Sequence, residues 1–459
     1  MGRYNRFKSS IMSSLGTAIF LAIAPVAHGE TLGDALSIAY RTNPTVQAQR
    51  ANVRATGELR HQAVANLLPQ ITANGNITRQ NIRQVSSAPG PFDTNNFEVL
   101  NGFTYGGNGD QLIFDGLQSI YAVKQAADQI DAAEAQLVAI EQQLLIDVAT
   151  AYFDVQRDVE VFSFNNSNVE VLVRQLEQAS VRFRVGEITR TDVAQADARL
   201  ASSRAEMTNA RAQLAVSRAR YVELVGQSPG TLEAVTDLPE IPNSLTDAVA
   251  LAKEIAPGIL IAKATERASK KNIKIAKGTF SPTVTANVNY NFGDEQSTFI
   301  SESESFTYGV RANVPIFQGG TRLSQIRQAK ANNDADKQRV IEAERQVASQ
   351  VTAAWEQLKA AESTIISAQK AVEANELALR GVRKEALVGT RDTLDVLNAE
   401  LESLNAQVGL VSAQRNAQVA TFSLMGSIGM LTPQSVGILP YEEKKSGGFG
   451  IGRFRIGNR

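Results

Sequence analysis

The sequence predicts a mainly α-helical protein with a small β part, in which one structural unit occurs twice. Three observations lead to this prediction. One long stretch contains neither glycine nor proline, a second stretch with the same apolar pattern follows it, and short segments ahead of both alternate between apolar and polar residues. The predicted fold is a pair of long antiparallel helical hairpins forming an α-barrel, with four transmembrane β-strands per chain.

The first long stretch covers residues 117–185 and is predicted to be a single helix. At about 1.5 Å per residue such a helix would be roughly 100 Å long, far longer than the core of an ordinary globular domain. Its apolar residues recur at every seventh position, which is the spacing that lets one helix pack along a partner. These residues are Val148, Val155, Phe162, Val169, Leu176 and Phe183.

An internal repeat connects the two halves of the chain. Leu32-Gly33-Asp34-Ala35 matches Leu245-Thr246-Asp247-Ala248, and further pairs follow at a spacing of 213 residues at first and of 203 residues from Tyr105 onward. Matches that continue from Leu32 to Gly226 indicate that the chain contains two copies of one structural unit. The further pairs are Pro44/Pro257, Pro69/Pro282, Tyr105/Tyr308, Gly186/Gly389 and Gly226/Gly429.

Each repeat is predicted to contain the same elements in the same order. Short helices come first, and then a hairpin, a long helix and a return helix, with glycine closing each helical turn. The first repeat is assigned to residues 30–243, with the hairpin at about 69–114, the long helix at 117–185 and the return helix at 191–226. The second is assigned to residues 244–435, with the corresponding elements at about 282–317, 320–388 and 393–429.

The hairpins show an alternation with period two. Ile71, Ala73 and Gly75 alternate with polar residues, and Phe306, Tyr308 and Val310 do the same in the second repeat. Strands with one apolar face suit a transmembrane barrel, although a soluble hairpin has the same period. Four strands cannot close a barrel, so the chain must associate with copies of itself. Two copies would give eight strands and three would give twelve, and the residues alone do not choose.

The two ends of the chain differ from the repeats. Residues 1–29 resemble a secretory signal, with Arg3, Arg6 and Lys8 ahead of an apolar core and a small-residue cleavage site. Its removal changes the formal net charge from −1 to −4, because it carries three basic residues and no acidic ones. A chain so close to neutral is not expected to bind nucleic acid. Residues 436–459 are predicted to be a disordered, basic, glycine-rich tail.

The side chains that usually support enzyme chemistry are scarce. The sequence has no cysteine, and His61 is the one histidine outside residues 1–29. Metal sites and nucleophile–base pairs draw mostly on these two residue types. We therefore expect no enzyme activity, no metal site and no cofactor.

The combined motifs resemble the TolC family of outer-membrane efflux proteins. They are the Leu-x-Asp-Ala-x-x-x-Ala openings at Leu32 and Leu245, the Leu-Pro-x-Ile start at Leu68, and the Val-Gly-x-x-x-x-x-Asp-Val turns at Val185 and Val388. The resemblance implies a homotrimer with a twelve-stranded barrel in the outer membrane of a Gram-negative bacterium and a helical tunnel in the periplasm. It also implies passive export of drugs or proteins, in efflux or type I secretion. The implied partners are outer-membrane lipid, a periplasmic adaptor and an inner-membrane transporter of the RND or ABC type.

The resemblance also assigns roles to residues at the helical turns. Arg391 matches a basic gate position, Thr191 and Asp192 match its partners, and Asp395 matches an acidic constriction. Two further positions depart from the family pattern, because Ala386 replaces an expected tyrosine and Asn398 an expected acidic residue. The turns themselves are the expected adaptor-docking surface, with the residues Val185, Gly186, Val388 and Gly389.

One other function stays compatible with the residue pattern. A soluble periplasmic coiled-coil scaffold would use the same long helices, but it would require the four strands to fold as a soluble sheet. A species that needs detergent for extraction supports the duct, and a species soluble in buffer supports the scaffold.

Overall fold

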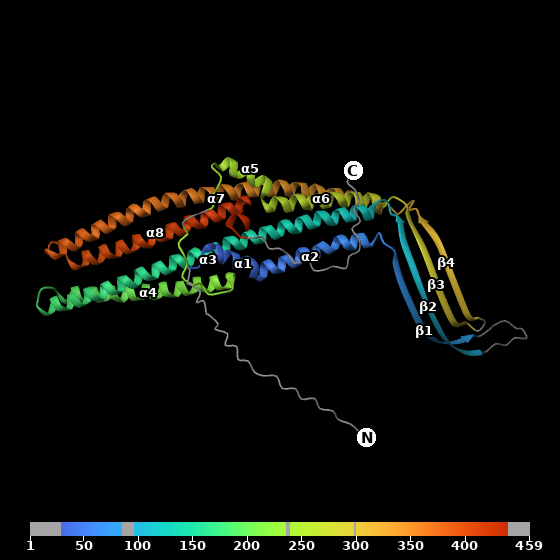
Figure 1. Cartoon of the computed structure of the whole chain (residues 1–459), viewed down its shortest axis with the longest axis horizontal. Coiled ribbons are helices and arrows are strands. Elements are labelled where there is room, and N and C mark those ends of the chain that lie inside the picture. Colours follow the sequence, from blue (N-terminus) through green and yellow to red (C-terminus); the bar gives the residue numbers. More distant parts are fainter. Residues whose placement is uncertain (1–28, 85–95, 236–238, 298–299, 439–459) are drawn as a thin grey trace, which may run out of the picture.

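The computed structural model describes residues 29–84, 96–235, 239–297 and 300–438. These residues form an elongated molecule with a β-sheet at one end and two long helical hairpins reaching to the other (Figure 1). The predicted signal segment, residues 1–29, lies outside the described residues except for Gly29. So does the predicted tail from residue 439 onward. Val436 to Ile438 are described, and there Ile438 is buried in the core, so the ordered chain extends into the range predicted as tail.

The helices and strands occur in the same order in both halves. None of the helices in the described part is both long and apolar enough to span a membrane. The elements are α1 (Leu32–Thr42), α2 (Pro44–Ala65), β1 (Gln70–Gln84), β2 (Asn96–Phe114), α3 (Gln118–Arg184), α4 (Arg190–Val225), α5 (Leu245–Ile255), α6 (Pro257–Gly278), β3 (Thr283–Ser297), β4 (Ile300–Asn313), α7 (Thr321–Leu387), α8 (Thr393–Ile428) and a short 3₁₀ turn (Gln434–Val436).

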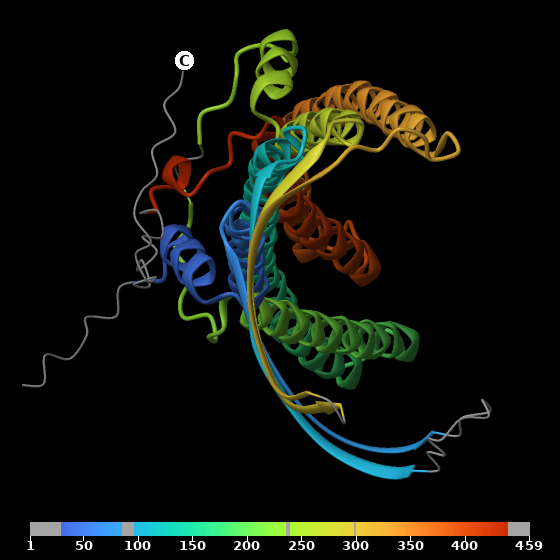
Figure 2. The same ribbon diagram turned by 90° about the vertical axis from the view of Figure 1, so that its right-hand side faces the viewer.

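The longer helices form a curved wall, against which the short helices α1 and α5 pack (Figure 2). Next to the sheet, α6 lies between α3 and α7, and α2 covers the other side of α3. Farther from the sheet, α8 takes the place of α6 between α3 and α7, and α4 takes the place of α2. Along the whole length of the wall, α7 therefore forms one side edge. The other side edge is α2 next to the sheet and α4 farther from it.

The four strands form one antiparallel sheet in the order β1-β2-β3-β4, so β1 and β4 are its edges. The sheet is strongly curved (Figure 2). Its register places the apolar residues of neighbouring strands on the same face, as in the row Gly109, Val288 and Tyr308. The opposite face carries polar rows such as Thr72, Asn108, Asn289 and Thr307. The strands of 14 to 19 residues are longer than the 9 to 11 that a bilayer requires.

The main core lies midway along the molecule, where α1, α3, α4 and α8 meet. Its largest buried side chains are Tyr152, Phe153, Tyr221 and Phe422. The Tyr152 hydroxyl lies 2.8 Å and 2.7 Å from the carbonyl oxygens of Glu30 and Glu233, which share its single proton. These contacts fix the first described residues and the connection between the repeats against α3.

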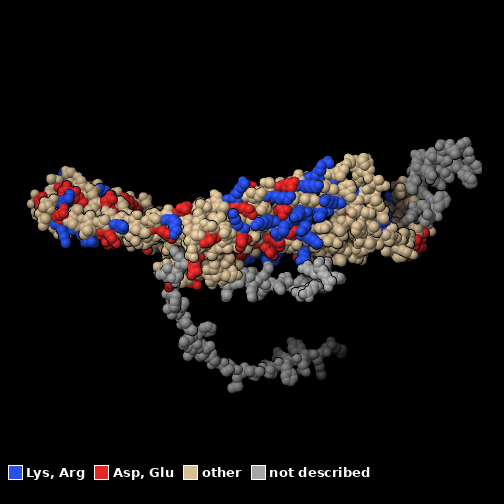
Figure 3. Space-filling view, turned by 90° about the horizontal axis from the view of Figure 1, so that it is seen from above, with Lys and Arg blue, Asp and Glu red and all other residues tan. Residues whose placement is uncertain are grey.

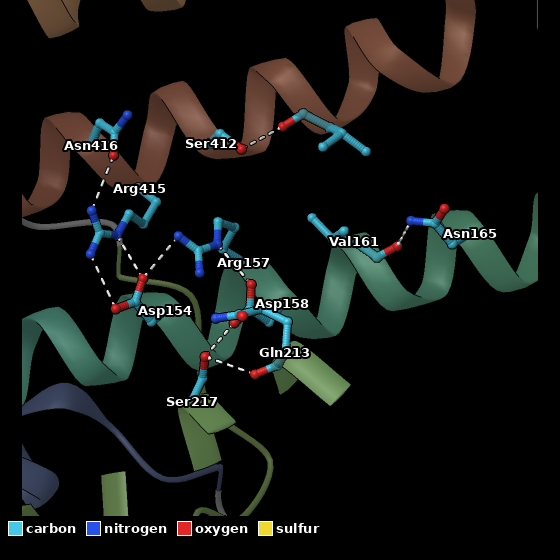
Figure 4. A network of polar contacts seen from close by, with 11 residues as sticks. Asp154, Arg157, Asp158, Val161, Asn165, Gln213, Ser217, Ser412, Arg415 and Asn416 are labelled. Carbon is cyan, nitrogen blue, oxygen red and sulfur yellow. Dashed lines mark hydrogen bonds and ion pairs between the residues drawn. The ribbon is translucent and has the colours of Figure 1, made fainter. Parts of the chain in front are cut away.

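A polar cluster next to this core joins three helices (Figure 4). Arg415 of α8 and Arg157 of α3 both form ion pairs with Asp154, at 2.8 Å and 3.0 Å. Arg157 also pairs with Asp158, whose carboxylate accepts a hydrogen bond from Ser217 of α4. Each charge is thus compensated, as partly buried ions require. The cluster ties α8 to the first hairpin near the middle of the molecule.

Candidate functional site at the helical tips

Both long helices end in the same turn. Gly186 and Gly389 adopt φ values of +81° and +82°, the left-handed conformation that glycine reaches without strain. After each glycine, the next backbone N–H bonds back into the last turn of the helix, from Glu187 to Arg182 and from Thr390 to Glu385. This is the Schellman arrangement that closes a helix. It places Val185 and Val388 at the far end of the molecule, where both side chains are exposed.

The return helices begin with side-chain caps. Thr189 caps α4 and accepts from the Asp192 backbone, while the Asp192 carboxylate accepts from the Thr189 N–H at 2.8 Å and from its hydroxyl at 2.9 Å. In α8, Asp392 caps the helix and accepts from the Asp395 N–H at 2.8 Å. Asp192 therefore stabilises its own helix, whatever else it contacts.

Arg391 contacts acidic residues of its own hairpin within the single chain. Its guanidinium lies 2.9 Å from Glu385 and 3.5 Å from Asp395. The hydrogen bond to Glu385, together with the negative charge of Asp395, raises the pKa of Arg391 above its ordinary value. Of the four predicted gate residues, the structure thus brings Arg391 and Asp395 together. The contact partner of Asp192 is Thr189, a residue that the sequence analysis did not single out.

The tips of the two hairpins face each other across a cavity of about 410 Å³. Asp192 from the first hairpin and Arg391 from the second both line it, so the two predicted partners lie on opposite sides of one space. Ala386 also lines this cavity, at the position where the family resemblance implies a tyrosine. Other lining residues include the polar side chains of Gln175, Arg182, Arg383, Asp392 and Glu400.

A buried carboxylate links the hairpins one step further from the tips. The Glu400 side chain of α8 is only 4 % exposed. Its Oε1 accepts hydrogen bonds from Gln175 of α3 at 2.5 Å and from Arg383 of α7 at 3.0 Å. Its other oxygen and the Gln175 Oε1 are buried and find no hydrogen-bond partner among the described residues. The network is therefore only partly satisfied, which makes it weaker than a complete one.

Two further contacts near Glu400 also connect the two hairpins. Arg199 of α4 donates to the Asn398 Oδ1 of α8 at 2.7 Å. Leu172, Leu200 and Leu397 form a small apolar cluster between α3, α4 and α8. We refer to the contacts of Gln175, Arg199, Arg383, Asn398 and Glu400, together with these three leucines, as the hairpin junction.

Sequence reasoning missed most of the hairpin junction. Thr189 was detectable, because Thr-x-x-Asp ahead of a helix is the pattern of a capping box. Asn398 appeared only as a departure from a family pattern, whereas the structure gives it a partner. Gln175 and Glu400 lie 225 positions apart in the chain, and no local pattern connects them. Within the described residues, no group of histidine, cysteine and acidic side chains could hold a metal ion.

Comparisons with known proteins place this architecture in a family. The model of the family described as outer membrane efflux protein matches residues 35–227 and 248–430. The outer membrane efflux protein BepC of Brucella suis is 32% identical over 95% of this chain and 94% of its own length. The outer membrane protein TolC of Vibrio cholerae is 28% identical over 94% of this chain and 96% of its own.

The solved structures agree with this relationship at the level of the fold. The Campylobacter jejuni CmeC outer membrane channel superposes with a TM-score of 0.76, over 87% of this chain and 85% of that one, at 16% identity. The fold, the repeats and the sequence identity together lead to one conclusion. The chain belongs to the outer membrane efflux protein family, whose members are channel proteins of the outer membrane.

Proposed function

We propose that three copies of this chain form a continuous exit duct across the outer membrane and the periplasm, closed at the helical tips until a transport complex opens it. One observation carries the proposal: the sheet and the helical wall both end in open sides. Edge strands β1 and β4 have unpaired backbone groups on their outer sides, which are not tolerated in lipid. Three copies would pair each β4 with the β1 of the next copy and close twelve strands.

The helices support the same closure. Helix α7 buries only six residues over its 67, whereas α3, which is equally long, buries seventeen. The exposed side of α7 carries large apolar residues such as Ile341, Ile366 and Leu377. At the opposite end of the wall, Val216 of α4 is exposed as well. A neighbouring copy would cover these residues, because large exposed apolar side chains of this kind mark a surface that contacts another protein.

An extraction experiment tests the assembly. We expect the full chain to fractionate with outer membranes and to form a heat-modifiable oligomer whose mass in detergent corresponds to three copies. The alternative, a soluble periplasmic scaffold, gives a species that is stable in plain buffer. That result, with a folded sheet, would contradict the duct.

Closure of the periplasmic entrance is proposed to depend on two sets of contacts. The hairpin junction holds α8 against α3 and α4 within each copy. Between copies, Arg391 is proposed to contact Thr191 and Asp192 of the neighbour, exchanging its Glu385 contact for a ring of links. Asp395 of each copy would then line the narrowest point and favour cations over anions. Opening would break both sets and separate the hairpins.

Replacement of Arg391 by alanine, alone or with Asp192→Ala, is expected to raise single-channel conductance in planar bilayers. Each exposed pair contributes at most about 1 kcal/mol, but the symmetry repeats it in every copy. Asp192→Ala also removes a helix cap, so its effect needs a matched control. Thr189→Ala removes the same cap and keeps the carboxylate. Equal conductance in Arg391→Ala and the unaltered channel, with normal assembly, would eliminate the latch between copies.

The tips are proposed to dock a periplasmic adaptor that connects the duct to an inner-membrane transporter of the RND or ABC type. The support is that Val185, Leu387 and Val388 are exposed apolar residues around two glycine turns. An amphipathic helical partner would bury them in the groove between the hairpins. The exported substrate is proposed to be small molecules, as in efflux, or protein, as in type I secretion.

A further inference from the structure

A line of basic residues follows one face of α6. Lys263, Arg267, Lys270, Lys274 and Lys277 are spaced by four and three residues in turn, so they lie on a single helical stripe. The first two are engaged in the wall, since Lys263 lies 3.8 Å from Glu344 and Arg267 pairs with Asp128 and Asp131. The stripe therefore divides into a paired part and a remaining part nearer the sheet.

The remaining part consists of Lys270, Lys274 and Lys277. All three side chains are exposed. Within the described residues, no carboxylate lies within ion-pair distance of them, although charged neighbours such as Lys271 do have a partner. We call these three residues the lysine triplet. Three adjacent like charges without counter-ions repel one another, so the fold itself gains nothing from them.

The internal repeat supplies a comparison within the same chain. Helix α2 is the counterpart of α6, and in register its residues at the triplet positions are Gly57, His61 and Val64. Both helices have 22 residues, begin with proline and lead into a strand. The repeated fold therefore does not need lysine at these positions.

The triplet lies next to the sheet. Helix α6 ends at Gly278 and β3 begins at Thr283, with exposed Phe280 between them. On the neighbouring connection from β4 to α7, Ile316 and Phe317 are 93% and 85% exposed. Figure 3 shows many Lys and Arg side chains, with Asp and Glu among them, over α6 and α7, followed by a largely uncharged surface toward the sheet. An apolar collar beside a cationic band is the pattern of a membrane boundary.

We propose that the lysine triplet binds the headgroups of anionic phospholipids in the periplasmic leaflet of the outer membrane. The inference rests on the proposed membrane insertion of the sheet. Lys277 lies one residue before the end of α6 and six before Thr283, the first residue of β3, and Lys270 lies roughly 10 Å farther from the sheet along the helix. Headgroups extend several ångströms beyond the hydrocarbon, and lysine side chains reach toward them from outside the membrane. A trimer would present three such sites, one for each copy of the second repeat.

Native mass spectrometry of the full-length oligomer, released from detergent, measures this directly. The probes are phosphatidylglycerol and phosphatidylcholine of identical chain length. We expect the unaltered protein to retain phosphatidylglycerol in preference to phosphatidylcholine, and the preference to weaken as ionic strength rises. The triple variant Lys270→Gln, Lys274→Gln, Lys277→Gln is expected to lose this preference, with affinity falling by about tenfold or more.

The matched control is Lys359→Gln, Lys370→Gln, Lys384→Gln, which removes the same charge from α7 far from the sheet. It is expected to keep the preference, and an arginine version of the triplet should keep it as well. An unaltered oligomer with no preference, or a triplet variant that retains it, would overturn this inference and leave the duct intact. Failure of the unaltered chain to form a detergent-requiring oligomer would instead contradict the proposed function.

Discussion

Tyr308→Arg is expected to prevent stable assembly in the outer membrane, whereas Thr307→Arg at the adjacent position is expected to be tolerated. Tyr308 lies on the apolar face of edge strand β4, opposite Val288, and is 76% exposed in the single chain. Thr307 lies on the polar face, opposite Asn289. If the apolar face contacts lipid, arginine near the middle of the strand costs about 2–4 kcal/mol in each copy. A guanidinium on the other face would project into a water-filled lumen.

The measurement is the amount of heat-modifiable oligomer recovered from outer-membrane fractions. Both variants carry the same added charge on neighbouring residues of one strand. A difference in recovery between them therefore reflects the face of the strand and not a difference in expression or export. Tyr308→Phe keeps the apolar ring and serves as a further control. Equal recovery of the two arginine variants would show that the face carrying Tyr308 is not in lipid. Selective loss of Thr307→Arg would reverse the assignment of the two faces.

The large elements of this fold were predictable because their signals are local. The glycine-free, proline-free stretch indicates α3, and Gly186 and Gly389 indicate its turn and that of α7. Period-two alternation identified the face to which Ile71 and Tyr308 belong, because a strand's two faces are set by sequence parity alone. All four observed strands lie within the predicted hairpin ranges of about 69–114 and 282–317.

The contacts of the candidate site were not predictable in the same way. Arg391 was singled out from a family pattern, yet in the chain it pairs with Glu385, four residues ahead of Gly389. Glu400 resembles any other glutamate on a long helix, and nothing in its neighbours distinguishes it from Glu402. Its burial arises from packing between hairpins that are distant in sequence. Non-local contacts of this kind become visible only in three dimensions.

The same pair of glutamates provides the decisive test of the hairpin junction. Glu400→Ala is expected to raise single-channel conductance several-fold, whereas Glu402→Ala is expected to leave it unchanged. Both substitutions remove one negative charge from α8, but Glu402 is exposed and Glu400 is buried between Gln175 and Arg383. Loss of Glu400 would leave the Gln175 amide without its acceptor, while the half-exposed Arg383 can turn to water, at a cost of about 1–3 kcal/mol.

That cost falls on the closed entrance alone if opening already separates α8 from α3. Each loss of about 1.4 kcal/mol in the stability of the closed state then lowers the ratio of closed to open channels tenfold. Glu400→Gln should give an intermediate conductance, because it preserves a side-chain acceptor and removes the charge opposite Arg383. The Asp154–Arg415 pair lies far from the tips and is expected to persist during opening, so Arg415→Ala should impair assembly more than closure. If Glu400→Ala and Glu402→Ala assemble normally and conduct alike, the junction does not hold the entrance shut, and closure must depend on contacts between copies.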